Sequence, residues 1–209
     1  GEYSLDGGTT WATIENATNG IVPASAGSMS WVIPNATLIC QTAKIRIVDN
    51  ENETITKSTS VFALDLRAKF DITEPINGAT VYAGGNQYIR WTPYGTVPNG
   101  VILQYTTDGS TWNFVNTDGD HKVTNNGEYL WAVPAGALTS SGRVRVYDPD
   151  DAAYKYTATG AALWIKGKIF MLNDANHSPR GGESWSVGSS YDIKWTTQGT
   201  ISKYLIYYA

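Results

Sequence analysis

The residues best suited to chemistry are two aspartates that recur about a hundred residues apart. Asp6 stands in the segment Ser4–Trp11, and Asp108 stands in the similar segment Thr107–Trp112. In each segment Gly follows the Asp and Trp closes the motif. A carboxylate at such a place accepts hydrogen bonds from backbone N–H groups, while Gly supplies the positive φ of a tight turn. We therefore predict that Asp6 and Asp108 cap turns and that neither is catalytic.

A second set of carboxylates follows two similar strands and suits a hard cation. Ca²⁺ takes six to eight oxygen ligands, which loops between strands can supply. Because the acidic loops recur at equivalent places, Ca²⁺ is the one candidate cofactor. A solvated turn explains the same residues and is the interpretation that we favour. The candidate ligands are Asp49, Glu51, Asp148, Asp150 and Asp151.

The other reactive side chains lack the partners that catalysis needs. His121 and His177 lie far apart with no Cys or second His nearby, so we expect no zinc site. Cys40 is the single cysteine, which excludes a disulfide within this segment and predicts a buried, inert thiol. The sequence offers no acid–base constellation, and we expect a protein that is not an enzyme.

Four asparagines carry the N-glycosylation motif Asn-x-Ser/Thr. A chain this rich in Asn, Ser and Thr contains several such motifs by chance, so they matter only where the source glycosylates its surface proteins. The four candidates are Asn16, Asn35, Asn52 and Asn176.

Composition points to strands and to a secreted protein. Only 16% of the 209 residues are charged, and the net charge of −4 argues against nucleic-acid binding. Turn-forming Gly and Asn and strand-forming aromatic residues are abundant. No apolar stretch approaches the roughly 18 residues that a membrane-spanning helix needs. We expect an extracellular or cell-surface location.

The elements that position these residues form an internal repeat, which decides the architecture. Copies of each motif are 99 to 104 residues apart. We expect the last two-thirds of one repeat in residues 1–67, a complete repeat in 68–166, and the first third of another in 167–209. The matching pairs are Trp31–Pro34 with Trp131–Pro134, Lys44–Asp49 with Arg143–Asp148, and Ile89–Thr92 with Ile193–Thr196.

The complete repeat holds about seven short strands with turn signals every 8–12 residues, which is the pattern of an all-β immunoglobulin-like or fibronectin-like sandwich. We expect tandem sandwiches of about 100 residues each. On one strand Val144 and Val146 should face inward, and Arg143 and Arg145 outward. The expected core residues are Trp31, Trp91, Ile102, Trp131, Val144 and Val146. The expected strands are 69–73, 88–92, 101–105, 112–115, 128–133, 143–147 and 161–165, and a short extended segment is expected at 80–82.

These motifs resemble the immunoglobulin-like, Asp-box-containing repeats of large bacterial and archaeal cell-surface proteins. The resemblance rests on Pro-x-x-Gly, Ile-x-Trp-Thr, the Asp-Gly turn before Trp, Trp-x-Val-Pro and Arg-Val-Arg-Val-x-Asp, and it covers the whole chain. It implies a stalk, fibre or surface-layer segment. The Asp box also resembles turns of sialidase propellers, but propeller blades repeat every 40–50 residues, so the hundred-residue spacing excludes that fold.

Tryptophan suggests a second function, the binding of sugars. Exposed aromatic rings stack on sugars, and a row of them would make a carbohydrate-binding or adhesive module. Six of the eight Trp recur at equivalent positions, which favours packing over binding. The remaining two also align with apolar residues: Trp164 with Phe62 or Ala63, and Trp185 with Val81 or Tyr82. Sugar binding therefore stays the alternative.

The function that we expect first is mechanical: a non-enzymatic segment of an extracellular filament, stalk or surface layer. Its expected partners are copies of itself or adjacent repeats of one long chain, with surface glycans as the alternative. The connections Leu64–Ala68 and Lys166–Lys168 leave little slack, so the array should be semi-rigid. The two partial repeats complement each other, either within one continuous polypeptide or head to tail between chains.

Overall fold

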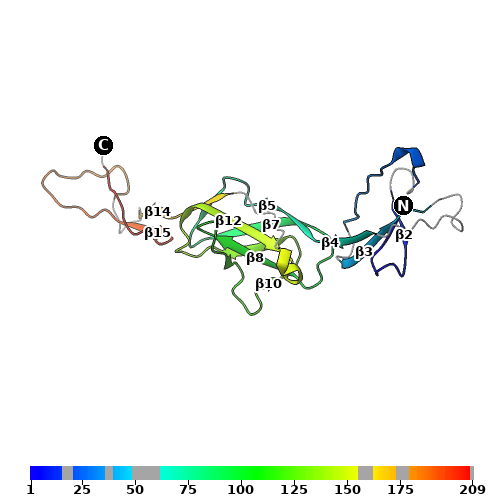
Figure 1. The fold of residues 1–209 in the computed structure, drawn as a ribbon. Coiled ribbons are helices and arrows are strands. Elements are labelled where there is room, and N and C mark those ends of the chain that lie inside the picture. Colours follow the sequence, from blue (N-terminus) through cyan, green and yellow to red (C-terminus); the bar gives the residue numbers. More distant parts are fainter. Residues whose placement is uncertain (16–20, 36–39, 49–61, 155–161, 173–178, 208–209) are drawn as a thin grey trace.

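The chain is all-β and elongated. The computed structural model describes residues 1–209 except 16–20, 36–39, 49–61, 155–161, 173–178 and 208–209. Figure 1 shows three groups of strands in a row. Helical structure in the described ranges is limited to the 3₁₀ turns η1 (Ala24–Ala26) and η2 (Pro149–Tyr154). No helix in that part of the chain is long and apolar enough to cross a membrane.

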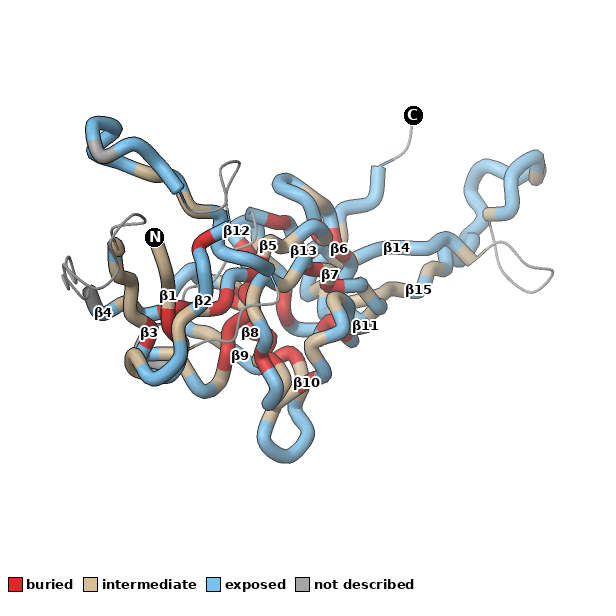
Figure 2. The backbone as a smooth tube through the Cα atoms, turned by 90° about the vertical axis from the view of Figure 1, so that its right-hand side faces the viewer, coloured by how far each residue is buried: buried red, intermediate tan, exposed pale blue. Residues whose placement is uncertain are grey.

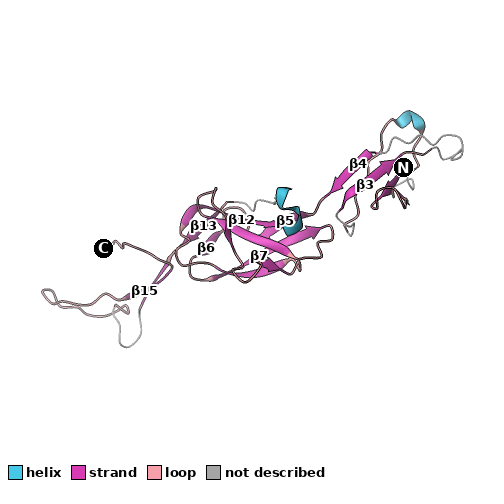
Figure 3. Ribbon diagram, turned by 60° about the horizontal axis from the view of Figure 1, so that its bottom comes forward, coloured by secondary structure: helices cyan, strands magenta, loops and turns pink. Residues whose placement is uncertain are grey.

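The N-terminal group is one antiparallel sheet in the order β2-β1-β3-β4. Two residues separate its last strand from the first strand of the central group, and Figure 3 shows the chain passing directly from one group to the next. The four strands are β1 (Glu2–Ser4), β2 (Ala12–Thr13), β3 (Cys40–Arg46) and β4 (Phe62–Leu66).

The central group is a sandwich of two sheets. One sheet has the order β11-β7-β5, and the other has the order β10-β8-β12-β13-β6 with β9 paired to β8. Strand β6 runs parallel to β13, and the other pairs are antiparallel. The first sheet contains β5 (Lys69–Glu74), β7 (Asn86–Tyr94) and β11 (Glu128–Ala132). The second contains β6 (Thr80–Tyr82), β8 (Val101–Thr106), β9 (Asn113–Phe114), β10 (Lys122–Val123), β12 (Thr139–Tyr147) and β13 (Leu163–Lys166).

The core lies between these two sheets, where the buried residues of Figure 2 gather. Strand-forming apolar residues alternate with polar ones, so one face of each strand is removed from water. Strand β10 is the one element here that the sequence pattern did not predict. The expected core residues that are buried in this sandwich are Trp91, Trp131, Val144 and Val146.

One predicted core residue faces the other way. Ile102 is half-buried, whereas its neighbour Leu103 is fully buried. Leu103 lies opposite Val146 across β8 and β12, so these two side chains share the inner face. The prediction for Ile102 was wrong because β8 is apolar at three successive positions, which hides its alternation.

The C-terminal group is a pair of antiparallel strands, β14 (Lys168–Met171) and β15 (Trp195–Gln198). It repeats β5 and β7 of the central sandwich. Met171 lies opposite Trp195 in the same way that Ile72 lies opposite Trp91. Gly167 alone separates β13 from β14.

The N-terminal sheet repeats the cross-strand register of the central sheet that contains β8, β9 and β12. Tyr3 lies opposite Ile45 in β1 and β3, and Tyr105 lies opposite Val144 in β8 and β12. Strand β2 pairs with β1 in the same register as β9 with β8. These matches place three strands of each sheet, β1, β2 and β3 with β8, β9 and β12, in correspondence without any shift.

Both sheets also carry the same irregularity. The pairing of β3 with β4 shifts between Cys40 and Ala43, and the pairing of β12 with β13 shifts between Thr139 and Gly142. The two positions are 99 residues apart in each case. A bulge bends a strand and increases its twist, so a bulge at matching positions shapes both sheets alike.

Trp31 was expected in a core, but it is half-buried. Its ring lies 5.0 Å from that of Tyr3, the same centroid distance as between Trp131 and Tyr105. Trp131 is covered because its strand β11 pairs with β7 in the opposite sheet. Among the described residues no such sheet faces the N-terminal sheet, and residues 27–34 are not in a strand. The prediction for Trp31 was wrong for this reason.

Candidate functional site

A network of short hydrogen bonds closes the first Asp turn. Strand β1 ends at Ser4, whose buried hydroxyl donates to Asp6 Oδ1 at 2.7 Å. The same oxygen accepts the backbone N–H groups of Thr9 at 2.9 Å and Thr10 at 2.8 Å. Gly7 takes the positive φ of 76° that the sharp reversal requires. The Asp6 carboxylate thus holds the turn between β1 and β2.

The second Asp turn has the same network on different residues. Thr106 Oγ1 donates to Asp108 Oδ1 at 2.9 Å, and this oxygen accepts the N–H groups of Ser110 at 2.8 Å and Thr111 at 2.7 Å. Thr106 is fully buried and replaces Ser4 of the first turn. The sequence motif was matched one residue too late and missed Thr106. A hydroxyl residue two positions before each Asp was the available signal.

Both turn carboxylates are held in the charged form. Hydrogen bonding by Thr10 lowers the pKa of Asp6 far below its usual 3.8, and the Thr111 N–H does the same for the pKa of Asp108. Bonds donated to a carboxylate favour its ionised state. A carboxyl group with so low a pKa does not hold a proton at neutral pH, so it cannot serve there as a general acid.

Each Asp turn ends in a Trp that covers an Arg. The guanidinium of Arg46 lies 4.3 Å from the centre of the Trp11 ring, and that of Arg145 lies 4.0 Å from the centre of the Trp112 ring. Such contacts are favourable between a cation and an aromatic face. Arg145 also donates from Nε to Gln104 Oε1 at 2.8 Å. Arg145 lies on the outer face of the sheet, yet it is only 9% exposed, and burial lowers its pKa.

The three described carboxylates of the candidate calcium loop have separate partners. Asp148 Oδ1 accepts the N–H of Asp150 at 2.9 Å, and burial raises the pKa of Asp148. Asp150 accepts a bond from Asn99 Nδ2 at 2.6 Å, and Asp151 lies 3.8 Å from Arg67 Nη1. Within the described ranges, no three His, Cys, Asp or Glu side chains gather closely enough to hold a metal ion. The other candidates, Asp49 and Glu51, lie outside the described residues.

The remaining candidates are scattered. Asn35 is exposed, and its backbone oxygen accepts the N–H of Gly95 at 2.9 Å. Cys40 is half-buried in β3, so the expectation of a buried thiol holds only in part. His121 stacks on Phe114 with ring centroids 3.9 Å apart. The candidates outside the described residues are Asn16, Asn52, Asn176 and His177.

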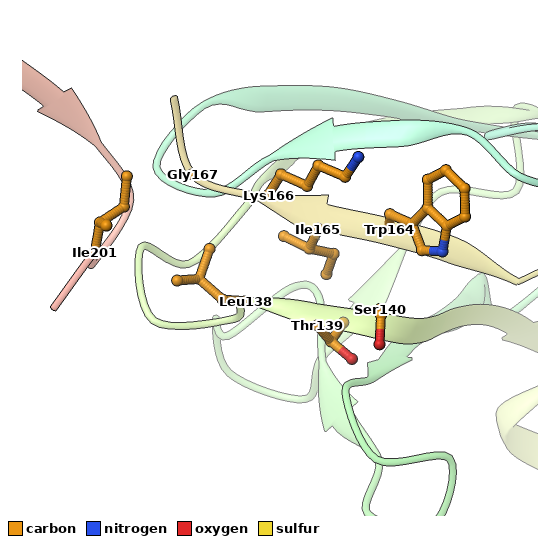
Figure 4. A pocket seen from close by; sticks show the side chains of 8 residues that line it. All are labelled: Leu138, Thr139, Ser140, Trp164, Ile165, Lys166, Gly167 and Ile201. Carbon is orange, nitrogen blue, oxygen red and sulfur yellow. The ribbon is translucent and has the colours of Figure 1, made fainter. Parts of the chain in front are cut away.

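An open groove lies between the central sandwich and the C-terminal pair (Figure 4). Its volume is about 500 Å³. Trp164 of β13 is 45% exposed, and the ammonium of Lys166 lies 4.7 Å from the centre of the Trp164 ring. Figure 4 shows Ile201 on the far side of the groove from Trp164. The lining residues are Leu138, Thr139, Ser140, Trp164, Ile165, Lys166, Gly167 and Ile201.

Trp164 does not occupy the place that the sequence alignment gave it. Ile165 pairs with Thr139 as Leu66 pairs with Cys40, so Trp164 corresponds to Asp65. The alignment with Phe62 or Ala63 was wrong because it assumed an offset of 101 or 102 residues, whereas this strand repeats after 99 residues. Trp164 therefore does not correspond to an apolar residue of the N-terminal repeat, so a shared packing role does not explain it. Trp185 is 40% exposed and stacks on Tyr191 with centroids 4.6 Å apart.

No family model, no curated protein and no solved structure matches this chain.

Proposed function

We propose that this chain is a non-enzymatic structural segment of an extracellular filament, stalk or surface layer, built of tandem immunoglobulin-like sandwiches. The proposed repeats are residues 1–67, 68–166 and 167–209. Strand order in the central sandwich supports the immunoglobulin-like part. Strands β5, β7 and β11 correspond in chain order to A, B and E, and the facing β8, β12 and β13 correspond to C, F and G.

The shared register of the N-terminal and central sheets carries the proposal. Two sheets with the same cross-strand register and the same bulge share one backbone geometry. Such units stack in one dimension, because each contacts mainly the unit before it and the unit after it. Repetition of one structural unit is the property that a stalk or fibre needs.

The junctions between the groups are also alike, which supports a stiff array. The loop after β7 binds the preceding repeat, where the Gly95 N–H donates to the Asn35 carbonyl at 2.9 Å. The loop after β15 does the same, since the Thr200 N–H donates to the Ala135 carbonyl at 2.8 Å. Asn35 and Ala135 each follow the Pro of the recurring Trp-x-x-Pro motif.

The polar residues of the Asp turns support a role outside catalysis. Asp6 and Asp108 bind backbone N–H groups, and Arg46 and Arg145 lie against Trp rings. Because the same assembly occurs in both sheets, turn closure explains these residues without a substrate. The extracellular location is part of the proposal and rests on composition and on the resemblance of the motifs.

Small-angle X-ray scattering tests whether the row of repeats is stiff. The unaltered chain should give one narrow distribution of maximum dimension, whereas a flexible insertion of about eight Gly and Ser residues after Gly167 should broaden it. The same insertion between Gly119 and Asp120, in an exposed loop of the central sandwich, is the control and should leave the distribution unchanged. A distribution for the unaltered chain as broad as that of the Gly167 insertion would refute the stiff array.

Sugar binding is the second candidate function, and the exposed position of Trp164 favours it. The groove offers an aromatic face, the ammonium of Lys166 and the exposed Ser140, which are groups that can hold a sugar ring. A glycan array followed by titration tests it. Trp164→Ala should weaken any binding at least about ten-fold, while Trp185→Ala, the matched control, should not. An array without signal would remove this candidate.

A further inference from the structure

The two junctions between the groups of strands hold their cations in different surroundings. The junction segments match each other with a constant offset of 99 residues. In the first junction two ion pairs lie on one face, Arg67 with Asp65 and Lys69 with Asp71. These four residues alternate with buried ones, so they point away from the core. Each cation of the first junction thus has a carboxylate two residues away.

In the second junction both carboxylates are replaced by aromatic rings, while both positive charges are kept. The aromatic residues are Trp164 and Phe170, and the cations are Lys166 and Lys168. Within the described residues neither lysine forms an ion pair. The second junction therefore presents two ammonium groups that no carboxylate of the described chain neutralises.

The two lysines and the aromatic rings share one exposed face. The ammonium of Lys168 lies 4.7 Å from the centre of the Phe170 ring and 5.3 Å from that of the Tyr82 ring. Lys166 pairs with Tyr82 across β13 and β6, so their side chains lie on the same side of the sheet. Figure 4 shows Lys166 beside Trp164 on the same strand. We call these five side chains the junction stripe: Tyr82, Trp164, Lys166, Lys168 and Phe170.

The junction stripe belongs to the outer surface of the repeats. At the first junction the sandwich that follows has both of its sheets, and the equivalents of three stripe residues stay open there. The side chain of Asp65 is 40% exposed, that of Lys69 is 67% exposed and that of Asp71 is 42% exposed. Phe170 takes the outward position of Asp71, so a second sheet in its repeat would leave it open.

Building on sugar binding as the second candidate function, we propose that the junction stripe binds an acidic oligosaccharide that carries uronic acid carboxylates. Aromatic faces stack on sugar rings, and ammonium groups form charge-assisted hydrogen bonds with carboxylates. Contacts between an ammonium and a ring are weak at exposed sites. A carboxylate can therefore draw each ammonium away from its ring and leave the ring face to the sugar.

The difference between the junctions favours a saccharide over an acidic peptide. A peptide carboxylate needs only the cations, and the first junction has these as well. What the second junction gains is aromatic faces, and these fit the rings of a sugar. Trp164 and Phe170 are six residues apart, and six residues of extended chain span about 20 Å. The stripe is thus long enough for an oligosaccharide.

Titration calorimetry of the full chain tests the ligand class. The probes are a panel of oligouronates, the methyl ester of each, the corresponding neutral oligosaccharides and a polyglutamate peptide of equal charge. The best oligouronate should bind at least about ten-fold more tightly than its methyl ester and than the peptide. Its affinity should fall as the salt concentration rises, because the two ammonium groups are exposed.

A matched pair of lysine variants tests the site. Lys168→Gln should weaken binding of the best oligouronate at least about ten-fold, because it removes one ammonium of the stripe. Lys69→Gln is the control, since Lys69 is the equivalent lysine and has Asp71 as its partner, and it should leave the affinity unchanged. Trp164→Asp with Phe170→Asp gives the second junction the residue types of the first and should abolish binding, with an unchanged thermal midpoint as the test of folding.

Three results would overturn the proposal. Equal affinity for the acid and its methyl ester, or binding of neutral sugars alone, would exclude an acidic ligand and leave sugar binding in the groove standing. Equal affinity for polyglutamate, or equal losses in Lys168→Gln and Lys69→Gln, would exclude a saccharide site at the stripe. Absence of binding to every sugar would remove both this proposal and the second candidate function. The scattering test of the stiff array is independent of all three.

Discussion

Two tryptophans at equivalent places show what the second sheet of a sandwich contributes. Trp131 lies 5.0 Å from Tyr105 of β8, and Trp31 lies 5.0 Å from Tyr3 of β1, the strand that corresponds to β8 in register. Trp131 is 1% exposed, whereas Trp31 is half-buried. The ring contact thus recurs in both regions, whereas the burial of the Trp ring differs. Trp131 is covered because β11 pairs with β7 in the facing sheet, and the segment with Trp31 has no such pairing among the described residues.

The largest expected effect separates these two residues. Trp131→Ala should lower the free energy of unfolding of the central sandwich by about 3–5 kcal/mol, because it empties the core of a large ring. Trp31→Ala should change that quantity by less than about 0.5 kcal/mol, since it lies outside that core. Urea unfolding followed by far-UV circular dichroism measures both. Equal losses would break the comparison.

A smaller difference in lost stability is expected between the equivalent arginines Arg145 and Arg46. Arg145→Ala should cost about 1–3 kcal/mol, because it leaves the buried Gln104 oxygen without a donor. Arg46→Ala should cost about 0–1 kcal/mol, because its ion pair with Glu2 is partly solvated. Thermal unfolding of the two variants checks this order. A larger loss for Arg46→Ala would contradict it.

The Asp turns should respond to pH. The pKa of Asp108 is lowered in the folded chain, so the unfolded chain binds more protons as pH falls below about 5. Its contribution to stability is complete above the unfolded pKa and is lost as pH falls through the folded pKa. Asp108→Asn should lower the thermal midpoint by roughly a few degrees at pH 7 and by less at pH 3. A difference in thermal midpoint between the variant and the unaltered chain that is larger at pH 3 than at pH 7 would contradict this.

The smallest expected effect is on hydrogen exchange, and it should be the same in the two Asp turns. Asp6→Ala and Asp108→Ala should each speed hydrogen exchange at the amides that they bind, those of Thr10 and Thr111. Turn closure is local, so the facing sheet should not alter it. Exchange followed by NMR measures both sites. Acceleration in only one turn would show that the two turns differ.

The sequence predicted what repetition alone can reveal. Recurrence of Asp, Trp and Arg at fixed spacing pointed to strands, turns and capping roles, because those depend on near neighbours. Ile102 was misplaced because three apolar residues in a row leave the inner face undefined. Trp164 was misaligned because the offset between repeats falls from 101 to 99 residues along the chain, and the segment before Trp164 has no recurring motif that shows which offset applies. Burial of Trp31 depends on a facing sheet, which the repeat pattern does not specify.

The most direct measurement of the central claim is the strand register in solution. Interstrand nuclear Overhauser contacts should place Tyr3 opposite Ile45 and Tyr105 opposite Val144, with the register shift at Cys40–Ala43 matched at Thr139–Gly142. This result would establish the two sheets as copies of one structural unit. A register in the N-terminal sheet that differs by one residue, or a bulge in only one sheet, would contradict the account.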